Sequence, residues 1–208
     1  MSIDVNPTAI GLVLSGAIAP LLYVATVILG AAARARYSHV ANAVSELVET
    51  GAPHRAPLNV AFFAYNVLSM GFGLGITVLA ADPTIVLSGW LIVGTGVLGL
   101  AMTWFPMDPI GSAATRAGRG HLVLAGLMSV GTMASVLSFA TGSAATDGWS
   151  SFSAYSYLTF GVVLITGSAA ALSARGHWRT MGLWERITIG AFLQWQAVLA
   201  IVLLTTGS

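Results

Sequence analysis

Three side chains of this 208-residue chain have the chemistry of a general acid/base set: Glu46, Asp108 and His121. Each lies in or beside a polar segment that separates two long apolar runs. A carboxyl group surrounded by apolar side chains has a raised pKa, so it can hold and donate a proton near neutral pH. Because only one short segment separates Asp108 from His121, these two side chains can approach each other. We therefore treat the three residues as candidate catalytic groups.

The composition is typical of a protein embedded in a membrane. Hydrophobic residues make up 56% of the chain and charged residues 7%, whereas a soluble domain carries about a quarter charged residues. Six apolar runs are each long enough to cross a hydrocarbon core of about 30 Å as a helix. The predicted fold is all-α, one polytopic domain with six transmembrane helices near residues 8–33, 58–81, 84–105, 121–141, 152–173 and 183–205.

The basic residues are distributed unevenly among the polar segments. All eight are arginines, and they fall only in or beside the first, third and fifth segments between the apolar runs: Arg34, Arg36, Arg55, Arg116, Arg119, Arg175, Arg179 and Arg186. Cytoplasmic loops of membrane proteins are enriched in Lys and Arg. This asymmetry predicts a multi-pass protein of the cell membrane with these three segments in the cytoplasm and both termini outside. The candidate catalytic groups would then lie at the cytoplasmic face.

The first of these segments, residues 34–57, has the pattern of a short amphipathic helix between the first and second spans. Apolar residues recur at helical spacing at Val40, Val44, Leu47 and Val48. Gly51 and Pro53 are typical of the end of such a helix. We expect it to lie in the membrane interface or to fold back over the bundle. Glu46 and Glu49, on its other face, are then either solvated or part of a functional site.

Further residues near the same side could bind a substrate. Aromatic faces stabilise a developing cation, and arginines can hold an anionic headgroup or a substrate phosphate. The candidate substrate-binding residues are Trp104, Phe105, Asn59, Tyr65, Asn66, Arg116 and Arg119. A structural alternative is open for the same region. Asp108 and His121 would then only fix a loop, and Arg and Trp residues would anchor the protein at the membrane interface.

Several of these residues belong to a pattern that resembles a known family. Ser45-Glu46-Leu47 is followed by Gly51, Pro53 and Asn59, then by Phe105-Pro106-x-Asp108 and His121-Leu122. Together they resemble the bacterial and archaeal membrane proteins of domain of unknown function 998, over nearly the whole chain. The resemblance implies a six-helix integral membrane protein and no established activity. The residues that match its signature are again Glu46, Asp108 and His121. Val48 stands where much of the family has Gly.

We expect an enzyme that acts on a lipid or isoprenoid substrate by general acid/base chemistry at the cytoplasmic face. Its ingredients are similar to those of membrane terpene cyclases, which protonate an isoprenoid. We expect neither a cofactor nor a metal, because the chain has no HExxH motif and no two His at i, i+4 spacing. A metal-dependent lipid hydrolase is a variant, with ligands from His39, His54, His121 and His177 together with Glu46 or Asp108.

Two other functions are open. The protein could bind lipids or assemble without catalysis, with its Gly-rich helices packed on a partner or on a second copy. It could also transport a small solute, although no ionised group lies near a predicted midplane. Nucleic acid is not an expected partner, because no dense basic cluster occurs. The arrangement of Glu46, Asp108 and His121 in the structure distinguishes these functions. If the three side chains converge on a closed apolar pocket, catalysis is favoured. If they are spread over a solvent-exposed surface, a binding or structural role is favoured.

Overall fold

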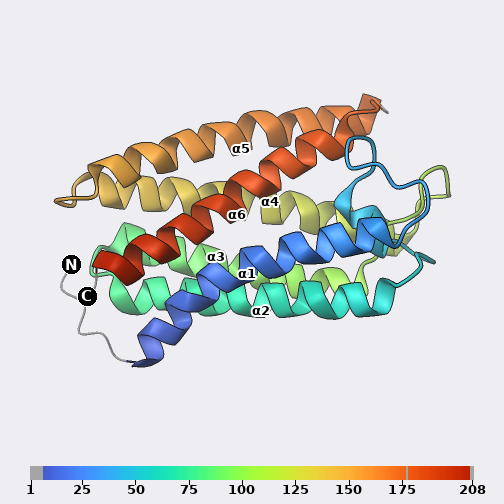
Figure 1. The fold of residues 1–208 in the computed structure, drawn as a ribbon. Helices are drawn as coiled ribbons and strands as arrows, with labels where there is room; N and C mark the ends of the chain where they lie inside the picture. Colours follow the sequence, from blue (N-terminus) through green and yellow to red (C-terminus); the bar gives the residue numbers. More distant parts are fainter. Residues whose placement is uncertain (1–6, 177, 207–208) are drawn as a thin grey trace.

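In the computed structural model, residues 7–176 and 178–206 are described, and they form six long α-helices without a strand (Figure 1). The helices are α1 (Pro7–Ala32), α2 (Arg55–Leu79), α3 (Pro83–Ala101), α4 (Arg116–Ala144), α5 (Ser150–Gly176) and α6 (Met181–Thr206). Two short 3-10 helices, η1 (Val44–Val48) and η2 (Met102–Trp104), lie in the connections. All six long helices are apolar enough to cross a membrane. The predicted all-α, six-span architecture is confirmed.

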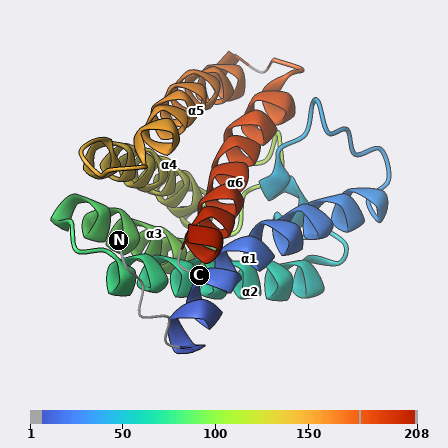
Figure 2. The ribbon, with the colours of Figure 1, turned by 60° about the vertical axis from the view of Figure 1, so that its left-hand side comes forward.

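Consecutive helices pack side by side, and α6 closes the bundle against α1 (Figures 1 and 2). The tight turn between α2 and α3 shows why neighbours are antiparallel. Asp82 caps α3 by accepting hydrogen bonds from the backbone N–H groups of Thr84 and Ile85 at 2.8 and 3.1 Å. Pro83 at the first position is preset for a helix start. Further along, a Cβ added at Gly73 would lie 2.6 Å from the Gly89 carbonyl oxygen, so glycine is needed for this close approach.

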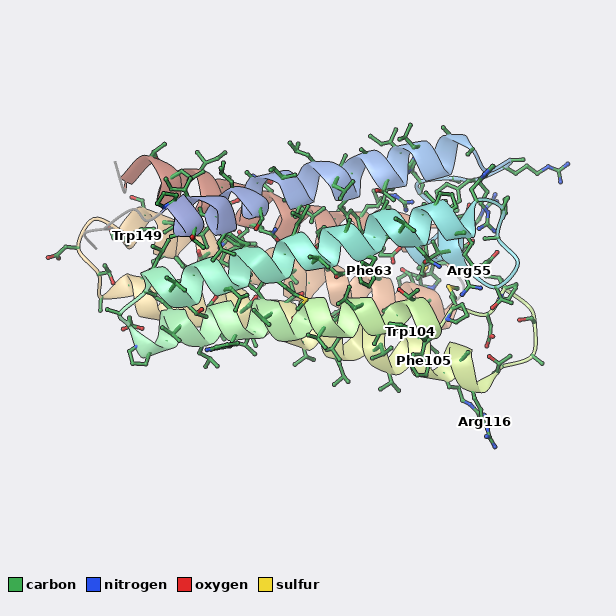
Figure 3. All side chains as sticks on the ribbon, turned by 90° about the horizontal axis from the view of Figure 1, so that it is seen from below. Arg55, Phe63, Trp104, Phe105, Arg116 and Trp149 are labelled. Carbon is green, nitrogen blue, oxygen red and sulfur yellow. The ribbon has the colours of Figure 1, made fainter. Side chains whose placement is uncertain are left out.

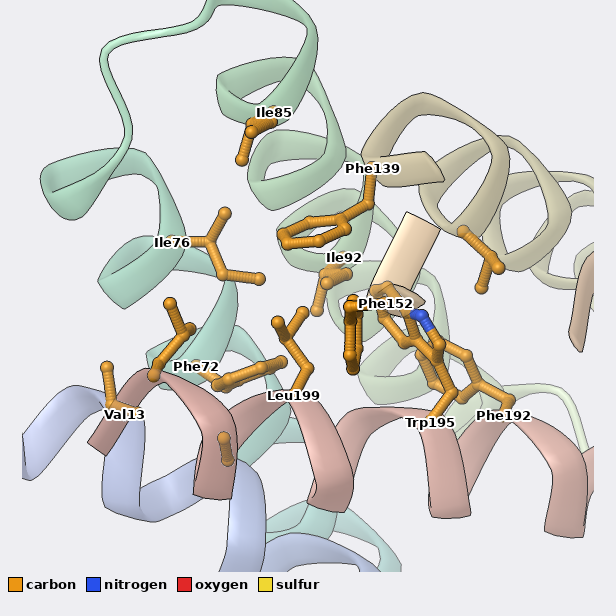
Figure 4. Close-up of a cluster of buried hydrophobic side chains, with 13 residues drawn as sticks. Val13, Phe72, Ile76, Ile85, Ile92, Phe139, Phe152, Phe192, Trp195 and Leu199 are labelled. Atoms are coloured by element: carbon orange, nitrogen blue, oxygen red, sulfur yellow. The ribbon is translucent and has the colours of Figure 1, made fainter. Parts of the chain in front are cut away.

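The connections 33–54 and 102–115, and residues 178–180 between α5 and α6, lie at one end of the bundle, on the right in Figure 1. Because every arginine belongs to one of these connections or to the adjoining helix turns, we call this the arginine end. The main hydrophobic core lies toward the opposite end, with side chains from all six helices (Figure 4). Trp195 is fully buried there and donates its indole N–H to the Ser156 hydroxyl at 2.9 Å.

Three details bear on the predictions for this end of the bundle. The predicted interfacial helix is not confirmed, because residues 34–54 contain only the single turn η1. Glu46 and Glu49 are not a solvated face, since they are 3% and 8% exposed. The helix expected to begin near His121 begins at Arg116, because Thr115 caps it by accepting a hydrogen bond from the Gly118 N–H at 3.0 Å.

Candidate functional site

The candidate catalytic residues form two separate clusters at the arginine end. Asp108 and His121 lie together where the α3–α4 loop meets the first turns of α4. Glu46 lies in η1, within residues 33–54, which we call the strap; η1 packs against α1, α2 and α6. The two regions touch through the backbone, where Thr50 N–H donates to the Met107 carbonyl at 3.0 Å. Within the described residues, no hydrogen bond or electrostatic interaction joins Glu46 to Asp108 or His121.

Asp108 holds the α3–α4 loop in place. Its Oδ2 accepts a hydrogen bond from the Thr115 N–H at 2.8 Å, and its Oδ1 accepts one from the Thr115 hydroxyl at 2.7 Å. These two bonds lower the pKa of Asp108, and the nearby charges of Arg119 and His121 add to the effect. The carboxyl group is therefore ionised at neutral pH and acts as an acceptor. This geometry suits a loop anchor better than a proton donor.

His121 is buried, with 6% of its surface exposed, in the second turn of α4. Its Nδ1 lies 2.9 Å from the carbonyl oxygen of Phe105. A carbonyl oxygen can only accept, so Nδ1 carries the proton in this pair. The neutral ring then has its free lone pair on Nε2, which has no hydrogen-bond partner in the described part of the chain. His121 is thus the one candidate group whose geometry leaves a base available.

Two glycines let the loop lie directly against α4. A Cβ at Gly118 would collide with the Asp108 carboxylate, and a Cβ at Gly120 would collide with the Phe105 ring. The short spacing of these glycines around Arg119 was a sequence signal for this contact. It marks a close approach of the loop to the helix rather than helix–helix packing.

Next to this cluster lie four of the candidate substrate-binding residues. Trp104 and Phe105 are exposed, at 69% and 39%, where α3 gives way to η2 and the loop. Arg116 and Arg119 are exposed in the first turn of α4, and neither forms an ion pair with any described residue. Figure 3 shows the Arg116 side chain extending away from the bundle, with Trp104 and Phe105 on the same side. The α4 start, residues 116–121, is therefore flanked by aromatic rings and carries two free cations.

The other three candidates lie elsewhere, on α2. The Asn66 amide donates to the Phe62 carbonyl at 2.8 Å and fills the space over Gly99 of α3. Tyr65 packs edge-on against Tyr23 of α1, with ring centroids 4.9 Å apart. Asn59 is half-buried near the start of α2 and makes no hydrogen bond with its side chain to the described residues. Asn66 and Tyr65 pack α2 against α3 and α1, and none of the three side chains lies at the α4 start.

In the strap, the carboxylates of Glu46 and Glu49 accept hydrogen bonds that hold the local backbone in place. Glu46 accepts hydrogen bonds from the Ala43 N–H and the Asn42 amide, both at 2.7 Å. Arg34 forms a salt bridge with Glu49 at 2.5 Å and donates a second hydrogen bond to the Glu46 carbonyl oxygen. Buried carboxylates require such partners. Both oxygens of Glu46 are thereby occupied within the strap.

Sequence reasoning missed the pair that ties the strap to α6. Glu185 accepts a hydrogen bond from the Val44 N–H at 2.7 Å. Arg186 donates to the carbonyl oxygens of His39, Asn42 and Gly182 and to the Tyr37 hydroxyl, at 2.6 to 2.9 Å. Burial raises the pKa of Tyr37 to about 12, so this hydroxyl keeps its proton and donates it to the Ala43 carbonyl at 2.7 Å. The one signal was that Glu185 and Arg186 are the only adjacent pair of opposite charges in the chain.

The candidate metal ligands are not gathered by the fold. His177 lies outside the described residues. Across residues 7–176 and 178–206, no three His, Asp or Glu side chains form a group that could hold a metal ion. The chemistry available around the α4 start is therefore that of one imidazole (His121), an ionised carboxylate (Asp108) and two free guanidinium groups.

Comparison with known proteins agrees with the sequence signature and with the fold. The family model described as "Protein of unknown function (DUF998)" matches residues 17–202, which is most of the chain and includes all three signature residues. No curated protein and no solved structure matches the chain. With its signature residues placed at one end of a six-helix bundle, this chain belongs to the DUF998 family.

Proposed function

We propose that this protein binds an anionic amphiphile of the membrane at the α4 start, in the leaflet that faces the cytoplasm. The observation that carries the proposal is the pair of free arginines, Arg116 and Arg119, in the first turn of α4. The N-terminal end of a helix carries a partial positive charge, so cations are unfavourable there unless an anion is close. Asp108 supplies one negative charge near Arg119, which leaves a net positive site.

The surroundings of the two arginines support a lipid rather than a soluble anion. Trp104 and Phe105 expose large aromatic surfaces beside the α4 start. Beyond it, exposed apolar residues continue along α4: Leu122, Val123, Leu127 and Val130. A molecule with an anionic headgroup and an apolar chain matches this order of charge, aromatic ring and aliphatic surface. Segregation of all arginines to this end supports its cytoplasmic orientation.

A second candidate function, an enzyme of lipid or isoprenoid metabolism, is favoured by one specific observation. The Phe105 carbonyl oxygen fixes the proton on Nδ1 of His121 and leaves Nε2 as a base close to the proposed headgroup site. A bound lipid could then lose a proton to Nε2. Glu46 and Asp108 take no part in this version, because their oxygens are held by the strap and by Thr115.

The proposal is tested by native mass spectrometry of the purified protein and by its binding to nanodiscs with and without anionic phospholipid. An anionic fraction of roughly 20% imitates the negatively charged cytoplasmic leaflet. The double variant Arg116→Gln/Arg119→Gln is expected to lose the co-purified anionic lipid and the preference for anionic nanodiscs. The matched control is Arg36→Gln/Arg175→Gln, which removes the same charge from two other exposed arginines. Equal losses in both variants would mean general electrostatic attraction and would contradict a site at the α4 start.

The same lipid extracts separate the two candidate functions. If the protein is an enzyme, His121→Asn accumulates a lipid species that the wild-type protein depletes. If the protein only binds, both preparations contain the same species in different amounts. A melting curve of His121→Asn must first show that the buried substitution leaves the fold intact, because it removes the bond to Phe105.

A further inference from the structure

The middle of α6 carries an amide side chain on its outer face. Within α6, 13 residues (181–193) precede Gln194 and 12 residues (195–206) follow it. At a rise of about 1.5 Å per residue, Gln194 lies about 18 Å or more from either end, deep within a hydrocarbon core whose half-thickness is about 15 Å. The residue is exposed, and its side chain makes no hydrogen bond within the described chain.

Gln194 lies on the side of α6 that faces away from the core. The buried side chains of α6 form the opposite face: Phe192, Leu193, Trp195, Gln196, Leu199, Ala200 and Leu203. At about 100° per residue, Gln194 lies roughly half a turn from the centre of that face. Figure 2 shows no other helix in front of α6. Lipid tails offer no hydrogen-bond partner, so an amide left in this position is costly.

Gln196, the other glutamine of α6, differs from Gln194 because it contacts neighbouring helices of the same chain. It is fully buried, and its amide approaches the Gly16 carbonyl and the Ser69 hydroxyl at 3.4 Å. Gln196 therefore joins α6 to α1 and α2. Gln194 has no comparable contact within one copy of the chain.

The residues around Gln194 form a regular seam. The outer face of α6 presents Leu183, Ile187, Gly190, Gln194, Ala197 and Ile201, all of them exposed or half-buried. The steps between them alternate between four and three residues, which is the 3.5-residue period of helices that pair in a left-handed supercoil. A Cβ at Gly190 would meet nothing within 4 Å, so this side of the helix is open. Small residues at Gly190 and Ala197 allow a second helix to approach closely on either side of Gln194.

We propose that this seam packs against α6 of a second copy of the chain. A primary amide both donates and accepts, so two Gln194 side chains complement each other across a two-fold axis. Two copies inserted in the same direction present parallel α6 helices, which places Gln194 opposite Gln194 and Ile187 opposite Ile187. This self-complementarity favours a second copy over a different protein. A single polar residue in an apolar seam also fixes the register of such a pair.

The chain contains no cysteine, so single cysteines give a clean cross-linking assay in native-like membranes. Ile187→Cys and Ile201→Cys are expected to form disulfide-linked dimers on oxidation. Val97→Cys is the control, because Val97 is 50% exposed on α3, whose main neighbours are α2 and α4. In the Ile187→Cys background, Gln194→Leu is expected to weaken dimerisation roughly 3- to 30-fold, whereas Gln194→Asn retains most of it.

Two outcomes would overturn the inference. One is equal cross-linking at Ile187→Cys and Val97→Cys, which would indicate random collision. The other is a dimer that persists unchanged in Gln194→Leu, which would place the interface elsewhere. Because Gln194 is exposed in one copy, Leu is tolerated by the fold, and a melting curve of the variant confirms this. The test does not depend on whether a lipid binds at the α4 start.

Discussion

Arg186 and Arg116 lie at the same end of the bundle and within the first two turns of their helices, yet they have opposite environments. Arg186 is half-buried and hydrogen-bonds to three backbone carbonyl oxygens and a tyrosine hydroxyl. Arg116 is exposed and has no partner among the described residues. Arg34, which pairs with Glu49, resembles Arg186, and Arg119 resembles Arg116. The difference separates arginines that build the fold from arginines that are free to bind.

Charge asymmetry alone cannot make this distinction. The enrichment of arginine on one side reflects membrane insertion and applies to all eight residues alike. Only the contacts show that the strap uses two of them, Arg34 and Arg186, to hold its backbone. The comparison therefore predicts opposite phenotypes. Substitutions in the strap, or of the α6 side chains that hold it, should lower stability, and substitutions at the α4 start should lower lipid binding without affecting stability.

The largest expected effect on stability is that of Arg186→Gln. This change leaves the carbonyl oxygens of His39 and Asn42 without their donor and weakens the attachment of the strap to α6, which then depends on the bond from Val44 to Glu185 and the backbone bond from Leu183 to Val40. Loss of a half-buried charged donor with several bonds costs about 3 kcal/mol. Thermal unfolding in detergent measures the loss, and hydrogen exchange should increase in residues 37–48. Arg116→Gln is the control and should change the free energy of unfolding by less than about 0.5 kcal/mol. If the two substitutions lowered the free energy of unfolding equally, the distinction between fold-stabilising and free arginines would be wrong.

A smaller effect is expected for Glu46, and here the choice of substitution decides between two interpretations. Glu46→Ala removes both acceptors and leaves the Ala43 N–H unpaired, at a cost of about 1–2 kcal/mol. Glu46→Gln keeps one acceptor oxygen for Ala43 and should cost less than half as much. If Glu46 were a catalytic acid, Gln would abolish function as completely as Ala. Lipid content and melting temperature measured on both variants therefore distinguish a backbone cap from a proton donor.

The sequence predicts the parts of this molecule that depend on local or periodic signals. Six apolar runs predict six spans, and Asp82-Pro83 predicts the start of α3, because these features act within a few residues. The approach of Asp108 and His121 was also predictable, since one short loop joins them. The link between the strap and α6 was not. Arg186 bonds to backbone atoms 144 and 147 residues away, and such contacts leave no periodic pattern.

The acidic residues show the same limit. A polar face with Glu46 and Glu49 looks identical in sequence whether the carboxylates meet water or cap buried backbone N–H groups. The outcome depends on Arg34, twelve residues before Glu46 in the strap, and on α6, which lies outside the segment. Gln194 and Gln196 are a second example, because only the packing of α6 shows that one faces the core and the other faces away from it.

The smallest expected effect is that of Asp108→Asn, and its dependence on pH identifies it. The two bonds from Thr115 lower the pKa of Asp108 below the usual aspartate value of 3.8. A carboxyl group whose pKa is lowered by folding contributes stability above the unfolded value and loses that contribution as the pH falls through the folded value. Asparagine does not titrate, so the wild-type protein should melt at a higher temperature than Asp108→Asn at pH 7, and the gap should close below about pH 4.

Asp108→Asn also sharpens the contrast between the strap and the α4 start. The substitution loosens the loop at Thr115 and removes the negative charge nearest Arg119, so the site becomes more positive. Binding to anionic nanodiscs should therefore be kept or slightly strengthened although the protein is slightly less stable. If the difference in melting temperature between the wild-type protein and Asp108→Asn did not change with pH, the lost stability would come from the altered loop bonds and not from the carboxylate charge. A loss of anionic lipid would show that Asp108 positions the α4 start for binding. Fold stability and lipid binding would then depend on the same residue, and the contrast between the strap and the α4 start would not hold at Asp108.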